Sequence, residues 1–180
     1  MDETQNIKTF LLPETKPEKK VKTEKEKKIR VITQNKKWLK QTNIENIMSD
    51  SEKQYQIFIS KEENLEIYNL MMKEIQQKIN GYCSQDVEKK LLNESFVDIE
   101  YCIELLRKSG FRCYYCRKFV KVLYKNVREP EQWSLERIDN KHGHIKGNVE
   151  IACLSCNLRR RTMYHEKFIF TKQLNITKIE

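Results

Sequence analysis

The sequence predicts an α+β fold, in which a small C-terminal domain at residues 111–180 follows α-helices at 51–110 and a disordered basic tail at 1–50. Three observations predict this organisation. Two Cys-x-x-Cys pairs flank short apolar runs near the C-terminus, apolar residues recur at helical spacing in the middle of the chain, and the N-terminal segment is polar and rich in Lys. A length of 180 residues suits one compact domain with a tail.

The charge is spread unevenly along a chain with a formal net charge of +9. Residues 111–180 hold 15 Lys and Arg against 7 Asp and Glu, whereas residues 41–110 hold 8 against 13. The basic C-terminal part favours a polyanionic partner such as nucleic acid over an ordinary solvated surface. No apolar run suits a membrane span or a secretory signal, so we expect no membrane attachment and an intracellular, reducing compartment, cytoplasm or nucleus.

The N-terminal tail carries basic clusters at 19–20 and 27–28 and at Arg30. It lacks apolar periodicity, which predicts disorder. Its composition is compatible with a solubilising segment, a phosphate-binding arm or a nuclear-import signal.

The middle of the chain shows two helical patterns. Residues from about 52 to 93 follow helical steps, and Gly81 is expected to end the first helix. Ser95 is expected to cap the second helix, with Asp98 three residues on, and Gly110 follows its end. The apolar stripes consist of Ile67, Leu70, Met71, Ile75 and Ile79 in the first helix and of Ile99, Cys102, Ile103 and Leu106 in the second.

Signals for shorter elements follow residue 111. Residues 119–124, 133–138 and 149–154 are predicted to be strands, and residues 158–170 a helix. The last two strands flank a loop that contains Gly, Lys and His. This order predicts a hairpin held against a helix.

Two cysteine pairs, Cys113/Cys116 and Cys153/Cys156, have the spacing of metal ligands. In a reducing compartment such pairs indicate a metal rather than disulfides. Four thiolates meet the tetrahedral preference of Zn²⁺ and leave no open position for chemistry, so the predicted ion is structural. The alternatives are two unrelated pairs of core cysteines or a redox pair.

Three further segments accompany the cysteines. They read Leu-Glu-Arg-Ile-Asp-Asn at 135–140, Gly-His-Ile-Lys-Gly-Asn-Val at 143–149, and Cys-Leu-Ser-Cys-Asn at 153–157 before three Arg residues. With the first cysteine pair, this string resembles the HNH (ββα-metal, His-Me finger) endonucleases over about residues 113–165. It is most similar to a four-cysteine zinc subgroup with an Asp/Glu-Arg-Ile-Asp-Asn first strand, found in phage and large-virus nucleases.

The resemblance implies a second, catalytic ion, Mg²⁺ or Mn²⁺, bound by Glu136 and Asn157. It also implies that Asn148 orients the general base or tightens the loop. Arg137 stands where the family has the His that acts as base. A guanidinium stays protonated, so Arg137 is expected to clamp the phosphate and stabilise negative charge in the transition state.

The general base must then come from another residue. We expect it to be His144, because imidazole titrates in the useful range and His144 lies near Asn148 in the motif. His142 and Asp139 are the other candidates. Both histidines are equally compatible with loop contacts to the DNA backbone.

Four basic residues near the motif are expected to contact phosphates rather than read bases. They are Lys146, Arg159, Arg160 and Arg161. Three aromatic residues, Tyr114, Tyr115 and Trp133, are better explained as a small core around the cysteines than as platforms for stacked bases.

The expected function is a metal-dependent endonuclease that hydrolyses DNA phosphodiester bonds. The alternative is a catalytically degenerate, zinc-stabilised nucleic-acid-binding module. A zinc-stabilised protein-interaction domain would leave the basic C-terminal charge without a role. Glu136 and Asn157 favour the enzyme, because a binding module has no need of a carboxylate that faces phosphate.

Overall fold

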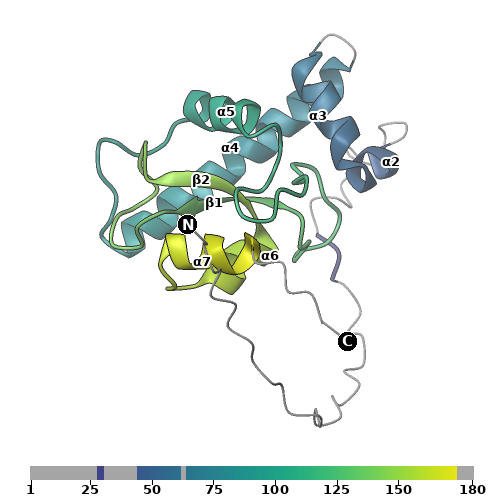
Figure 1. Ribbon diagram of the computed structural model, residues 1–180. Coiled ribbons are helices and arrows are strands. Elements are labelled where there is room, and N and C mark those ends of the chain that lie inside the picture. Colours follow the sequence, from purple (N-terminus) through teal and green to yellow (C-terminus); the bar gives the residue numbers. More distant parts are fainter. Residues whose placement is uncertain (1–27, 31–43, 62–63, 174–180) are drawn as a thin grey trace, which may run out of the picture.

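The computed structural model describes residues 28–30, 44–61 and 64–173, which form helices and one two-stranded antiparallel sheet (Figure 1). This confirms a small α+β fold. None of the helices in these ranges is long and apolar enough to cross a membrane. The elements are, in order, α2 Ile44–Ser49, α3 Ser51–Ile59, α4 Leu65–Glu88, α5 Ile99–Lys108, β1 Trp133–Arg137, β2 Val149–Cys153, α6 Leu154–Arg160 and α7 His165–Gln173.

The β1–β2 hairpin lies at the centre of the fold. Its register pairs Trp133 with Cys153 and Leu135 with Ile151, and these residues are buried. Figure 1 shows α5 on one side of the strands and α6 with α7 on the other. The sheet has only two strands, so these helices supply most of the apolar cover that it needs.

The long helix α4 begins at the N-cap Asn64, whose side chain accepts a hydrogen bond from the backbone N–H of Ile67 (3.1 Å). The predicted apolar stripe is buried at Ile67, Met71, Ile75 and Ile79. The expected end at Gly81 is wrong, because α4 continues to Glu88. Its C-terminal part also faces inward, through the buried side chains Tyr82 and Asp86, and this tertiary packing outweighs the low helix propensity of one glycine.

Gly81→Ala is expected to stabilise the protein by about 1 kcal/mol, because Gly81 lies inside a helix and an added Cβ meets nothing within 4 Å. The melting temperature should rise by about 2–4 °C in a thermal denaturation followed by circular dichroism. Gly110→Ala is the opposite control: φ is +58° at Gly110, so the same added methyl should destabilise. Equal effects of both changes would contradict this account.

Helix α5 is capped by Asp98, whose carboxylate accepts a hydrogen bond from the N–H of Tyr101 (2.8 Å). Ser95, the expected cap, therefore lies before the helix. The carboxylate of Asp98 also pairs with Lys146 in the loop between the strands. The start of α5 is thus set by a residue that serves both the helix and the loop.

The expected strand at 119–124 is absent from the described structure, although Val122 and Leu123 are buried. A side chain replaces the missing partner strand. The Oε1 atom of buried Gln54 accepts hydrogen bonds from the N–H groups of Val122 and Leu123 (both 2.9 Å). Its amide donates to the carbonyl oxygens of Leu123 and Ile47 (both 2.9 Å). Backbone groups can be satisfied in this way without a sheet.

The expected helix at 158–170 is two helices, α6 and α7, that are separated at Arg161, where φ is +52°. Helix α6 begins earlier than predicted, because the Sγ atom of Cys153 caps it by accepting the N–H of Cys156 (3.4 Å). The early start determines which side chains of α6 face inward.

Ordered structure begins before residue 51. Helix α2 lies within the segment expected as tail, and it buries Ile44, Ile47 and Met48 at helical spacing. The N–H of Arg30 donates to the carbonyl oxygen of Lys125 (2.9 Å). The remainder of the predicted tail, 1–27 and 31–43, lies outside the described residues.

Candidate metal centre and basic pocket

Four cysteine sulfurs meet where the loop after α5 approaches the end of the hairpin. The Sγ atoms of Cys113, Cys116, Cys153 and Cys156 all lie within 4.8 Å of one another. The sulfurs of Cys116 and Cys153 are 3.9 Å apart, close to the separation of about 3.8 Å that Zn–S bonds of about 2.3 Å give in a tetrahedron. The predicted grouping is confirmed, and the four cysteines can hold a metal ion.

The protonation of these thiols is coupled by their proximity. Hydrogen bonds with Cys113 and Cys153 raise the pKa of Cys156, whereas hydrogen bonds from Cys153 and Cys156 lower the pKa of Cys113. Four thiolates at this separation repel one another. A cation at their centre removes the repulsion and lets all four ionise.

Aromatic side chains pack around the cysteine cluster. The hydroxyl of buried Tyr115 lies 3.1 Å from Nδ1 of His165, and the rings of Tyr114 and His165 are stacked with centroids 5.0 Å apart. Tyr115 also meets Phe168 edge-on. His165, at the start of α7, is buried with them, and Trp133 is fully buried. Tyr115 and Trp133 are therefore core residues, as expected, and Tyr115 docks α7 against the cysteines.

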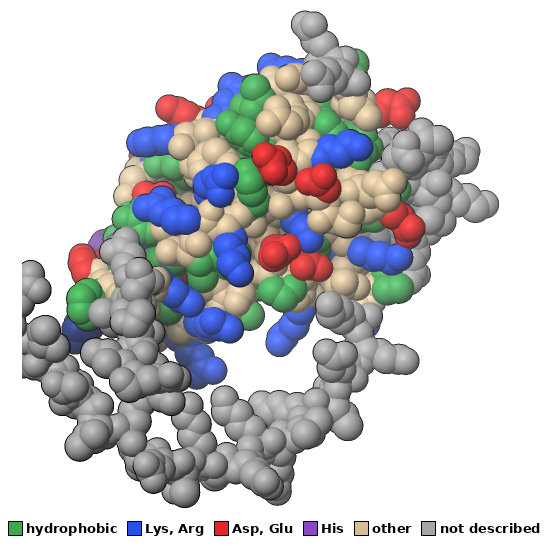
Figure 2. Space-filling view, turned by 45° about the vertical axis from the view of Figure 1, so that its right-hand side comes forward, with side chains coloured by type: hydrophobic (Ala, Val, Ile, Leu, Met, Phe, Trp, Pro, Cys, Tyr) green, Lys and Arg blue, Asp and Glu red, His purple; other side chains and the backbone are tan. Residues whose placement is uncertain are grey.

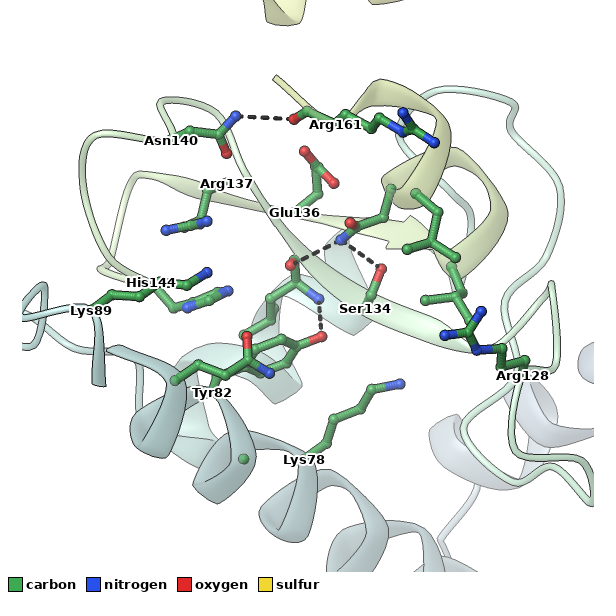
Figure 3. A pocket seen from close by; sticks show the side chains of 16 residues that line it. Lys78, Tyr82, Lys89, Arg128, Ser134, Glu136, Arg137, Asn140, His144 and Arg161 are labelled. Atoms are coloured by element: carbon green, nitrogen blue, oxygen red, sulfur yellow. Dashed lines mark hydrogen bonds between the residues drawn. The ribbon is translucent and has the colours of Figure 1, made fainter. Parts of the chain in front are cut away.

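A cavity of about 710 Å³ lies between α4, β1 and α6 (Figure 3). Among the described residues that line it, Glu136 is the one acid, and Asn157 and His144 line the cavity as well. Around them stand five basic side chains, from Lys78, Lys89, Arg128, Arg137 and Arg161. The cavity therefore combines a basic lining with a single carboxylate.

The carboxylate of Glu136 is 4% exposed and accepts a hydrogen bond from Arg160 at Oε1. Its other oxygen, Oε2, accepts no hydrogen bond from the described residues. Burial raises the pKa of Glu136 to about 7, against the opposing effects of Arg160 and Arg137. One oxygen of Glu136 is thus held by an arginine, and the other is available to the cavity.

The side chain of Asn157, in the first turns of α6, is oriented by the hydrogen bonds that its amide nitrogen donates. Nδ2 donates to the hydroxyl of Ser134 (3.3 Å) and to the carbonyl oxygen of Leu135 (3.4 Å) (Figure 3). The Ser134 hydroxyl donates its own proton to the carbonyl oxygen of Ala152 (3.0 Å), so it can only accept from Asn157. This leaves the amide oxygen of Asn157 without a protein partner among the described residues, beside a cavity that Glu136 also lines.

His144 is buried and is held by an acid from α4. Its Nδ1 lies 2.9 Å from Oδ1 of Asp86, and its backbone N–H donates to Oδ2 of Asp86 (2.6 Å). Burial lowers the pKa of His144, against an opposing effect of Asp86. Asp86 was not among the candidates from the sequence. Its helical spacing from Ile79 and Tyr82 continues the apolar stripe of α4, and this spacing could have indicated that Asp86 faces inward.

The other base candidates lie outside the cavity lining. Asp139 accepts the N–H of Lys141 (2.9 Å), which lowers the pKa of its carboxyl, and it pairs with exposed His142 (3.2 Å). Asn148 ties this loop together: its amide donates to the carbonyl oxygens of Asp139 (3.0 Å) and Gly143 (3.1 Å). Asn148 therefore lies where a loop-tightening residue should lie.

The predicted phosphate contacts differ in accessibility. Arg159 and Arg161 are exposed, but Arg160 is 3% exposed and donates to Glu136 and to the carbonyl oxygens of Arg137 and Ile138 (both 2.7 Å). Its guanidinium belongs to the interior and is not free for a phosphate. Lys146 is accessible and paired with Asp98.

Three basic residues of the cavity were missed because they lie outside the motif. Lys78 comes from α4, Lys89 follows directly after that helix, and Arg128 comes from the segment before β1. Lys78 is held against the carbonyl oxygen of Trp133 and the side chain of Gln132 (3.0 Å). Burial and the nearby Arg30 lower the pKa of Lys78 to about 7. No local pattern marks these residues, because the docking of α4 brings them to the hairpin.

No protein-family model, curated protein or solved structure matches the chain. The fold and the site define a small α+β protein with a four-cysteine cluster able to bind a metal and, beside it, a basic cavity around one carboxylate.

Proposed function

We propose that the protein is a metal-dependent endonuclease that hydrolyses DNA phosphodiester bonds and has an HNH-like ββα-metal arrangement. One observation carries the proposal: Glu136, with one carboxylate oxygen that accepts no hydrogen bond from the described residues, shares a cavity with the amide of Asn157 and the buried imidazole of His144, and the other charged residues of the lining are basic. The order of β1, β2 and α6, a hairpin that runs directly into a helix, supports the same arrangement.

The cysteine cluster would hold a structural Zn²⁺. All four ligands are sulfurs, and three of them, from Cys113, Cys153 and Cys156, are buried. Such a closed sulfur shell suits zinc and offers no position to a substrate. Its role is to fix the end of β2 and the start of α6, from which Asn157 projects.

The catalytic Mg²⁺ or Mn²⁺ would be bound by Glu136 and Asn157. Hard cations prefer oxygen ligands, and each of these residues has one side-chain oxygen without a hydrogen bond from the described residues. The cation, when bound, would stabilise the charge that develops on the phosphate and its leaving oxygen.

The remaining chemistry falls to Arg137 and His144. Arg137 lines the cavity and is anchored by one hydrogen bond to the carbonyl oxygen of His142 (3.2 Å), so its other donors can clamp a phosphate. Burial lowers the pKa of His144, which favours the neutral imidazole. A neutral imidazole can accept a proton from the attacking water.

Surface charge supports a polyanionic substrate less strongly than the cavity does. Figure 2 shows Lys and Arg side chains scattered over one face among Asp and Glu, without a continuous basic stripe. The cavity, by contrast, has five basic side chains and one acid. We therefore place the scissile phosphate in the cavity, which Arg161 lines, with Arg159 as a backbone contact outside it.

A catalytically degenerate nucleic-acid-binding module is the second candidate. The observation in its favour is the ion pair between Glu136 and Arg160, because a carboxylate neutralised by a buried arginine can be a purely structural group. In the endonuclease Glu136 would bind the catalytic cation, whereas in the binding module it would only pair with Arg160.

Glu136→Gln is expected to reduce the nicking of supercoiled plasmid DNA in Mg²⁺ or Mn²⁺ by at least about 100-fold, because an amide is a much weaker ligand than a carboxylate. Gln keeps the shape of the side chain and an oxygen that can accept from Arg160. Nicking is measured by the loss of supercoiled DNA on agarose gels, and DNA binding by fluorescence anisotropy.

Glu150→Gln is the matched control. Glu150 lies directly opposite Glu136 in the register of the hairpin but does not line the cavity, so its amide variant should nick normally. If the wild type and both variants bind plasmid but none of them nicks it, the protein is the binding module instead.

A further inference from the structure

His144 is held by three residues from outside its own loop. Asp86 of α4 binds both its Nδ1 (2.9 Å) and its backbone N–H (2.6 Å). The ring lies against Tyr82, one turn earlier in α4, with centroids 4.4 Å apart. The carbonyl oxygen of His144 accepts the N–H of Val97 (3.0 Å). Backbone and ring are therefore both fixed.

The approach between the loop and Asp86 is too close for a side chain at residue 143. A Cβ atom built on Gly143 would lie 2.6 Å from Oδ2 of Asp86 and 2.7 Å from the carbonyl oxygen of Leu91. Asp86 is itself fully buried. A simple loop anchor needs one carboxylate oxygen, and here the second oxygen is used on the imidazole.

The carboxylate determines where the imidazole carries its proton. A carboxylate accepts hydrogen bonds, so Nδ1 of His144 must be the protonated nitrogen. The lone pair of the neutral ring is then on Nε2, which has no hydrogen-bond partner among the described residues and belongs to a side chain that lines the cavity (Figure 3). The other charged groups near the ring, Arg137 of β1 and Lys89 after α4, disfavour the imidazolium, as burial does.

We propose that Asp86 is a positioning residue that holds His144 as the Nδ1–H tautomer, so that Nε2 faces the cavity as the proton acceptor. This rests on the proposed nuclease function. As the water oxygen bonds to phosphorus, Nε2 takes its proton, and the bond from phosphorus to the leaving oxygen breaks. The leaving oxygen is protonated from solvent, and the imidazolium, stabilised by Asp86, returns its proton to solvent. Helix α4 is then part of the active site rather than a support.

Asp86→Asn tests this role. The Asn oxygen can still accept the backbone N–H, but its amide would donate to Nδ1 and force the Nε2–H tautomer, which cannot act as the base. The plasmid-nicking rate should fall by about 10³–10⁴-fold, as expected for a base held in the wrong tautomer. The loss of rate at acidic pH that titration of His144 causes in the wild type should disappear. Glu88→Gln, an exposed acid at the end of α4, is the control and should nick normally.

The tautomer is measured directly by ¹⁵N NMR of the His144 ring in the wild-type protein, which needs neither activity nor a folded variant. Protonation at Nδ1 is expected. Protonation at Nε2 of the neutral ring, or an active wild type that Asp86→Asn matches in rate, would overturn the role of Asp86 alone. A wild type that nicks no plasmid would overturn the nuclease and this role together.

Discussion

Cys113→Ser is expected to abolish metal binding and to lower the melting temperature by about 10 °C or more, because metal binding at a four-cysteine site contributes directly to the free energy of folding. Cys113 is fully buried, and its sulfur joins those of Cys153 and Cys156 at the start of α6. Loss of the ion would release the end of the hairpin and the docked α7. Metal content by mass spectrometry and thermal denaturation with and without a chelator measure both effects.

Cys102→Ser is the matched control. Cys102 is equally buried in α5 but lies outside the cluster. This variant should be destabilised by the buried hydroxyl alone, by about 1–3 kcal/mol, and should keep its metal. The chelator should destabilise the wild type and Cys102→Ser but leave Cys113→Ser unchanged. A purified wild type that contains no metal and does not respond to the chelator would contradict the prediction.

Arg160→Ala is expected to lower the free energy of unfolding by about 3–5 kcal/mol, because it leaves a buried carboxylate without its partner. The guanidinium of Arg160 pairs with Glu136 and satisfies the carbonyl oxygens of Arg137 and Ile138. Its loss therefore affects the whole end of β1. Chemical denaturation in urea measures the change.

Arg159→Ala, a change at the neighbouring residue, is the control. Arg159 is exposed, so its removal should change stability by no more than about 0.5 kcal/mol. It should instead weaken DNA binding and reduce the slope of log affinity against log salt by about 1. Equal stability of the two variants would show that Arg160 is not part of the interior.

The cysteine cluster and the hairpin could be predicted from the sequence, because both are encoded by short-range patterns. Two cysteines separated by two residues can reach one ion. The strands predicted at 133–138 and 149–154 contain β1 and β2 completely and extend one residue beyond each. The same local logic failed at 119–124, where the predicted strand is absent and Gln54, far away in the chain, binds the backbone of buried Val122 and Leu123.

Local sequence patterns could not predict which of the three consecutive arginines is buried. Arg159, Arg160 and Arg161 are the same residue type, but the rotational phase of α6 buries Arg160 and exposes Arg159, and Arg161 lies beyond the end of the helix. That phase follows from the cap at Cys153, which places Arg160 four residues after buried Cys156 on the same helix face. A helix predicted to begin at 158 does not include Cys156, so the shared face of Cys156 and Arg160 could not be recognised. In the observed helix, which begins at Leu154, both residues lie on that face.

The sequence alone determined the chemical parts: four cysteines able to hold a metal ion, a carboxylate at Glu136, an amide at Asn157 and a histidine loop. Only the tertiary structure decided which of these groups share a cavity and what holds them. Asp86 and His144 are 58 residues apart, and they meet because α4 docks on the hairpin. Local patterns specify helices, strands and ligand spacing. The faces that two elements bury against each other depend on packing over the whole fold, and that packing joins α4 to the site.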